Sequence, residues 1–188
     1  EPHLSAIHAP PEYRKLETAS LAQFSGGAFL YVPKGARIAK PISICFSHYP
    51  SHPFAFPRVL AVVEEGAEVS VVEEHRFEER KASNDARKLS SIAFSRLSVG
   101  RGARVRYFYS QSLSLDTAHF WHHSVEMSAD ADLEHYSAML GGFLHKSEVE
   151  IRLAGPGARS RMYGLALGGR GQFYDPRTVQ WHRAPRTS

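Results

Sequence analysis

Cysteine is almost absent from this chain, and that absence excludes two kinds of site. The single cysteine, Cys45, has no partner for a disulfide within the chain, so a reducing compartment is favoured. One thiolate is also too few to hold an iron–sulfur cluster, which normally needs about four. Cys45 alternates with Ile44 and Phe46, so we expect it on the opposite strand face, as an inert cysteine.

Long apolar runs and targeting signals are also missing. No run of about 18 apolar residues occurs, so the sequence predicts no membrane-spanning helix and no membrane partner. The first residues carry neither a basic nor an apolar signal-peptide region, so no secretion is predicted. Because the chain begins with Glu1 and not with Met, we expect a processed product or a fragment. The expected location is the cytoplasm.

The charges are of both signs and scattered. The 23 Lys and Arg residues exceed the 19 Asp and Glu residues only slightly, for a net charge of +4. A nucleic-acid-binding protein would show a basic stripe interleaved with aromatic residues, and none is visible, so no nucleic-acid partner is predicted. The glycine-rich segment 168–171 lacks the Gly-Lys-Ser/Thr ending of a phosphate-binding loop, which favours a tight turn.

Internal repetition is the informative feature of the sequence. Five segments share a turn of small residues flanked by strand-like alternation of polar and apolar residues. The alanines of these turns are Ala36, Ala67, Ala103, Ala131 and Ala158, at intervals of 31, 36, 28 and 27 residues. Glycine suits such corners because it accepts positive φ, and alanine because the inner bend has little room.

Two repeat architectures use strands and turns at this period. A β-propeller would favour hairpin turns of the Asn-Gly or Asp-Gly type, and neither dipeptide occurs. A solenoid needs only that each coil stacks on the next and buries a continuous core. We therefore predict an all-β fold, a right-handed parallel β-helix formed as a flattened two-sheet solenoid with coils of about 30 residues.

The predicted β-helix domain covers residues 26–188. Residues 1–25 form a lead-in segment that is partly helical, with Pro11 to Ser25 as the best candidate for a short amphipathic helix. The widest interval between turns contains Glu78 to Lys88, a charge-rich insertion suited to an exposed loop.

Several ordered motifs resemble the SufB/SufD family, over roughly residues 20 to 188. The resemblance lies in the segments 29–35 (FLYVPKG), 58–67 (RVLAVVEEGA) and 148–188, with Tyr163-Gly164-Leu165, Gly171-Gln172, and His182 with Pro185 and Ser188. Leu140-Gly141-Gly142 resembles the SufD branch, and the "SCIL" segment typical of the SufB branch is absent.

The resemblance implies a SufD-like scaffold of the iron–sulfur cluster assembly (SUF) machinery, and not an enzyme. It implies association with a SufB-type subunit and a SufC-type ATPase, with the cluster built by the complex and not bound by this chain alone. Family members continue past the equivalent of Ser188 with further coils and a helical region that docks the ATPase. We therefore expect truncation at the C-terminal end, and the resemblance carries over no catalytic, cofactor-binding or metal residue. An end coil left open predicts a tendency of the isolated chain to form a homodimer.

Eleven histidines raise a metal hypothesis. On one strand His119 and His123 would share a face about 13 Å apart, too far to chelate one ion, although stacked coils could bring His135 or His145 alongside. The favoured interpretation is histidines in solvent or in loops, with a metal site and a partner contact as alternatives. For His182, a hydrogen-bonded histidine before a turn is favoured over a group at a scaffold interface.

A β-helical carbohydrate-active enzyme, a lyase or hydrolase, is the alternative function. Its candidate residues are Asp130, Asp132, Glu134, Asp175 and Trp181. Asp132 and Glu134 would share one strand face about 7 Å apart, within the range for paired carboxylates. Exposed polar positions on a strand explain them equally well, and the missing secretion signal counts against an extracellular enzyme.

Overall fold

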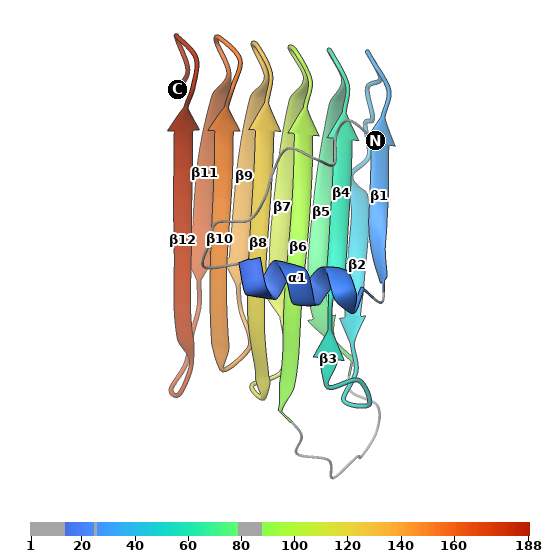
Figure 1. Cartoon of the computed structure of the whole chain (residues 1–188), viewed down its shortest axis with the longest axis vertical. Helices are drawn as coiled ribbons and strands as arrows, with labels where there is room; N and C mark the ends of the chain where they lie inside the picture. Colours follow the sequence, from blue (N-terminus) through green and yellow to red (C-terminus); the bar gives the residue numbers. More distant parts are fainter. Residues whose placement is uncertain (1–13, 25, 79–87) are drawn as a thin grey trace.

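The chain forms a parallel β-helix in a computed structural model that describes residues 14–24, 26–78 and 88–188 (Figure 1). Within these residues lie one helix, α1 (Arg14–Ala22), and twelve strands. The strands are β1 (Gly26–Val32), β2 (Ile42–His48), β3 (Phe54–Ala55), β4 (Pro57–Val63), β5 (Glu68–Phe77), β6 (Leu89–Val99), β7 (Arg104–Ser112), β8 (Thr117–Met127), β9 (Asp132–Met139), β10 (Leu144–Leu153), β11 (Arg159–Ala166) and β12 (Phe173–His182).

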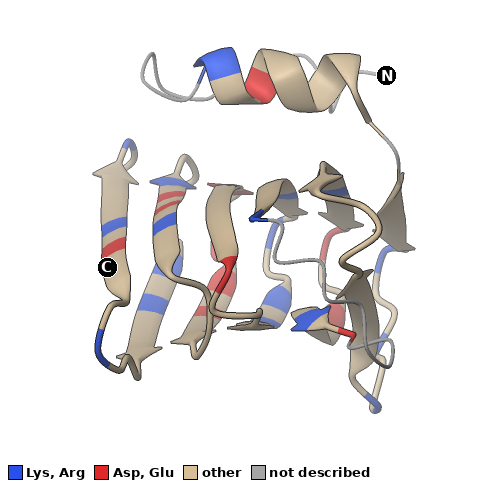
Figure 2. Ribbon diagram, turned by 90° about the horizontal axis from the view of Figure 1, so that it is seen from below, with Lys and Arg blue, Asp and Glu red and all other residues tan. Residues whose placement is uncertain are grey.

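Two parallel sheets face each other across the core, as Figure 2 shows. Sheet A has the order β1-β4-β6-β8-β10-β12, with β3 paired to β6, and sheet B has the order β11-β9-β7-β5-β2. The chain alternates between the sheets, so each strand pairs with the equivalent strand of the next coil. The predicted two-sheet solenoid is therefore confirmed.

The corners from sheet A to sheet B need a left-handed backbone conformation, as the Gly-Ala turns predict. Positive φ occurs at each of the five predicted corners, at Gly35, Gly66, Gly102, Asp130 and Gly157. Asp130 is the one non-glycine residue among them, with a φ of 56°. A sixth corner follows β12, where Arg186 has a φ of 59°, and the repeat pattern of the sequence did not reveal it.

Helix α1 lies against the outer face of sheet A, outside both sheets (Figures 1 and 2). It falls within the predicted segment from Pro11 to Ser25, whose end residues lie outside the described part of the chain. The contact has an apolar part, in which Leu16 packs against Phe94, and a polar part, in which the Glu17 carboxylate binds the guanidinium of Arg96 and lies 4.0 Å from that of Arg58. Arg58 also donates to the Ser20 hydroxyl at 3.0 Å. No described helix is long and apolar enough to cross a membrane.

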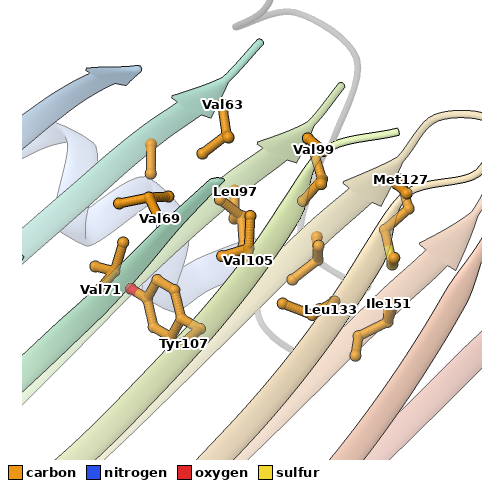
Figure 3. Packing of buried hydrophobic residues seen from close by; sticks show 14 of the residues in the cluster. Val63, Val69, Val71, Leu97, Val99, Val105, Tyr107, Met127, Leu133 and Ile151 are labelled. Carbon is orange, nitrogen blue, oxygen red and sulfur yellow. The ribbon is translucent and has the colours of Figure 1, made fainter. Parts of the chain in front are cut away.

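The interior has an apolar half and a polar half. Near the corners, Val63, Val99 and Met127 of sheet A face Val69, Val105 and Leu133 of sheet B, and all are almost fully buried (Figure 3). Towards the opposite ends of the strands the inward positions carry histidines, tyrosines and a glutamate. The loop was predicted from Glu78 to Lys88, and its residues 79–87 lie outside the described part of the chain.

Candidate functional site, a buried histidine cluster

The polar half of the interior forms what we call the histidine cluster. Strand alternation places these side chains inside, because they have the same parity as buried apolar residues: Glu73 and His75 follow Val69 and Val71 on β5. The cluster comprises His48, Glu73, His75, Ser95, Tyr107, Tyr109, His119, Trp121, His123, His135 and His145. Of these, His48 is the most exposed, at 8%.

Glu73 is the acceptor at one end of the cluster. Its carboxylate receives hydrogen bonds from the hydroxyls of Ser95 (2.8 Å) and Tyr107, and its Oε1 lies 3.0 Å from His75 Nε2. The indole of Trp121 donates in turn to the Ser95 oxygen at 3.1 Å. A buried carboxylate with several donors satisfies the requirement that polar groups in the core be hydrogen-bonded.

Two pairs of histidines face each other across strands. His48 Nε2 lies 3.2 Å from His75 Nδ1, and His123 Nδ1 lies 3.1 Å from His135 Nε2. Such a contact needs one nitrogen that carries a proton and one that does not. Both pairs are therefore satisfied when all four imidazoles are neutral.

The remaining imidazoles extend the cluster along the coils. His119 and His145 occupy register positions on neighbouring strands, with ring centroids 5.3 Å apart. His119 Nε2 lies 2.7 Å from the Tyr109 hydroxyl, and its ring centroid is 5.0 Å from that of His75. Neither nitrogen of His145 has a hydrogen-bond partner among the described residues.

Burial disfavours the charged form of five of these imidazoles, those of His48, His119, His123, His135 and His145. It lowers the pKa of His48 to about 3, helped by His75, and those of His135 and His145 to about 4. Burial also places the pKa values of His119 and His123 well below the ordinary histidine value. The two tyrosines shift upward: burial first, and then the Glu73 charge, raises the pKa of Tyr107 and of Tyr109 well above the usual value.

The expectation of histidines in solvent or in loops was wrong for seven of the eleven, since His48, His75, His119, His122, His123, His135 and His145 are all buried. His119, His123, His135 and His145 point into the core, because each has the parity of apolar neighbours on its strand. The anticipated approach of His135 and His145 did occur, in the contacts given above. In the described ranges no group of three or more His, Cys, Asp or Glu side chains is arranged to bind a metal ion.

His182 lies at the end of β12 and takes the hydrogen-bonded position that the sequence favoured. Its Nδ1 is 2.8 Å from the Thr187 hydroxyl, which donates to the carbonyl of Ala184 at 3.2 Å. The register of β12 against β10 places His182 beside Leu153, in line with the inward-facing residues. Its side chain is exposed.

The carboxylates proposed for a carbohydrate-active enzyme are engaged elsewhere. Arg161 binds both Asp132 (2.9 Å) and Glu134 (3.1 Å), and the pKa of Glu134 is lowered by its hydrogen bonds to Arg106 and Arg161. The other candidates lie apart from this pair: Asp175 pairs with Lys146 at 3.1 Å, Asp130 forms a corner, and Trp181 stacks with Arg183. The geometry gives this alternative no convergent acid and base.

Two further expectations concern the surface. Cys45 is exposed on the outer face of sheet B, opposite the inward-facing Ile44 and Phe46, as its parity predicts. The segment 168–171 forms a turn between β11 and β12, with a φ of 83° at Gly171. The tight turn predicted there is confirmed.

Sequence reasoning missed several residues of the cluster, among them Glu73, His75, Tyr107 and Tyr109. The alternation of the sequence could have identified them, because each occupies an inward position on a strand that also has apolar inward residues. A polar residue at a core position of a strand indicates a buried polar network.

Comparison with known proteins places the chain among the components of one assembly system. A family model described as "SUF system FeS cluster assembly, SufBD core domain" matches residues 46–188. The iron–sulfur cluster assembly protein SufB of Bacillus subtilis is 28% identical over 179 residues, which cover 95% of this chain and 37% of that protein. An iron–sulfur cluster assembly SufBD family protein of Staphylococcus epidermidis is also 28% identical, over 181 residues and with the same coverage. The chain thus spans well under half the length of these relatives.

Proposed function

Because the chain belongs to the SufBD family of the SUF iron–sulfur cluster assembly system, we propose that it acts there as a scaffold of the SufD type. The observation that carries the proposal is the family match across residues 46–188, which spans the coils from the end of β2 to β12. A scaffold acts through the surfaces that its fold presents, and stacked coils provide long, rigid ones.

The absence of catalysis in this segment is part of the proposal. Two observations support it. The imidazoles of the interior are buried away from any substrate, and Asp132 and Glu134 on the outer face of sheet B form ion pairs with Arg161 and, for Glu134, also with Arg106. An acid or base that is fully engaged in an ion pair is poorly suited to proton transfer.

The choice of the SufD branch and of its partners rests on the sequence. Segment 140–142 (Leu-Gly-Gly) resembles that branch, whereas one of the relatives above is named SufB. On this basis we propose a SufB-type subunit and a SufC-type ATPase as partners, in the cytoplasm. The iron–sulfur cluster would then be the product of the complex and not a group resident in this chain.

Co-purification tests the proposal and its branch together. The chain is expressed with a SufC-type ATPase and either a SufB-type or a SufD-type subunit from the same source, and each mixture is resolved by size exclusion. A SufD-type scaffold is expected to form a stoichiometric complex with the SufB-type subunit. Association with the SufD-type subunit alone would instead assign the chain to the SufB branch.

Absence of both complexes is interpreted with a longer chain. The same mixtures are repeated with the native gene product that contains residues 1–188. A complex that forms only with the longer product would place the docking surface outside this segment. Failure of the longer product to bind either subunit would contradict the scaffold function.

A further inference from the structure

The histidine cluster contains many more groups that can gain a positive charge than groups that can balance one. Six imidazoles point into it, from His48, His75, His119, His123, His135 and His145. Among the buried residues of the described chain, Glu73 is the one carboxylate that faces the interior. The others, Glu17, Glu148 and Glu150, belong to α1 and to the outer face of β10.

The groups facing the imidazoles from every packed strand are otherwise neutral. Tyr107, Tyr109 and Gln111 face them from β7, Ser91 and Ser95 from β6, Trp121 from β8, Ser147 from β10 and Tyr174 from β12. No lysine or arginine is buried among them in the ranges that the structure describes. Glu73 can thus balance one imidazolium, and each further proton leaves an uncompensated charge inside the core.

The pairs His48–His75 and His123–His135 further restrict the number of protons that the cluster can accept. A pair such as His123 and His135 keeps its nitrogen–nitrogen hydrogen bond while one of the two facing nitrogens lacks a proton. When both rings are fully protonated, each facing nitrogen is a donor, so the bond is lost and two like charges face each other across it. The same holds for His48 and His75. Protons added to the cluster therefore drive its side chains towards water.

The other half of the interior does not share this sensitivity. Near the corners the coils are closed by Val63, Val99 and Leu133, which carry no titratable group, and by a continuous ladder of backbone hydrogen bonds. Apolar burial of this kind is independent of pH. The corner half of each coil is thus stabilised by contacts that do not depend on pH. The other half is stabilised by contacts that are lost when its imidazoles gain protons.

We propose that the β-helix carries a proton-linked conformational switch, in which acidification opens the histidine half of the coils while the corner half stays closed. The opened state exposes the histidines of β5, β8 and β10 and the ends of the strands that carry them. The switch is a property of this chain's interior, and it does not depend on the proposed role in cluster assembly.

Hydrogen exchange measured by mass spectrometry over a pH series tests the switch on the full chain. After correction for the intrinsic pH dependence of exchange, protection in segments 73–77, 107–111 and 117–123 is expected to fall as pH drops below about 6.5. For each proton that the chain gains on opening, protection against exchange should fall about tenfold per pH unit. Segments 97–105 and 125–133, near the corners, should keep their protection over the same range. Equal loss in both halves would overturn the proposal.

His145→Leu provides a sharp variant, because it removes a titratable ring whose nitrogens have no partner among the described residues. The variant is expected to open at lower pH than the parent chain. Because one fewer proton is gained on opening, its loss of protection per pH unit should be smaller by a factor of up to about ten. His52→Gln is the matched control, since His52 is exposed and lies outside the cluster, and it should open like the parent chain. If His145→Leu also opens like the parent, the cluster is not the trigger. If it fails to fold, the comparison of the two halves in the parent chain still decides.

Discussion

At the scale of single residues, Gly155 shows how little room lies between stacked coils. A Cβ added there would meet the backbone nitrogen of Ala129 at 1.9 Å, whereas at Gly164 it would meet only the Ser137 hydroxyl, at 3.5 Å. Backbone atoms of a neighbouring coil cannot yield without disturbing the strand ladder. Gly155→Ala should therefore destabilise the chain by about 1–3 kcal/mol.

Gly164→Ala is the control for this prediction, since it adds the same methyl group one strand later. Its effect should lie within about 1 kcal/mol of zero, because the strand conformation suits alanine. Urea unfolding followed by circular dichroism gives both free energies. Equal stabilities of the two variants would mean that the coils separate more easily than the backbone contact implies.

At the scale of the element, α1 contacts sheet A through Leu16, which packs against Phe94, and through a buried carboxylate that meets two arginines. Glu17 is 6% exposed and bonds to Arg96 beside Arg58, so its loss removes a buried negative charge that lies next to two partly buried guanidinium groups. We expect Glu17→Gln to cost roughly 1–3 kcal/mol of unfolding free energy and to raise hydrogen exchange in α1 before exchange rises in the coils.

Glu65→Gln is the corresponding surface control. The Glu65 carboxylate lies 2.9 Å from the Lys34 ammonium, yet the side chains are 51% and 71% exposed. Such a pair is screened by water, and its loss should change stability by less than about 0.5 kcal/mol. If both variants behave alike, the buried position of Glu17 contributes nothing to docking of the helix.

The strands and corners were predictable because their rules act over a few neighbouring residues. Alternation places Val149 and Ile151 inside, and Gly66 and Gly102 meet the demand for positive φ. The inward direction of His119 followed from the same parity as Trp121, but histidine suits both water and a hydrogen-bonded core, so composition alone pointed the wrong way.

The contacts among the histidines were not predictable from local rules. His75 and His119 meet across the two sheets, and their meeting depends on the loops between strands, whose lengths vary from coil to coil. Asp130 illustrates the opposite case, since the four glycine corners identify its role although its own residue type does not. Register between coils is a property of the assembled solenoid.

At the scale of the whole molecule, the buried ionisable groups predict a stability that peaks between acid and alkaline limits. The folded-state pKa values of His48, His135 and His145 are lowered to about 3, 4 and 4, from the ordinary histidine value of 6.5. Below about pH 6.5 the unfolded chain therefore binds more protons than the folded one. The free energy of unfolding is therefore not reduced by the histidines above about pH 6.5, and it decreases as pH falls from there towards 4 and then 3.

At high pH the tyrosines make the free energy of unfolding decrease as pH rises, which is the opposite direction to the effect of the histidines. The pKa values of Tyr107 and Tyr109 are raised above the ordinary value of 10.0, so the unfolded chain loses protons first when pH rises above it. Unfolding free energies from urea titrations should be nearly constant between about pH 7 and 9, and fall on either side by up to about 1.4 kcal/mol per pH unit for each proton exchanged. Stability unchanged from about pH 7 to 5 would mean that the interior histidines are protonated without cost. The burial described for them would then be incompatible with the solution state, since several uncompensated imidazolium charges cannot remain inside a closed core.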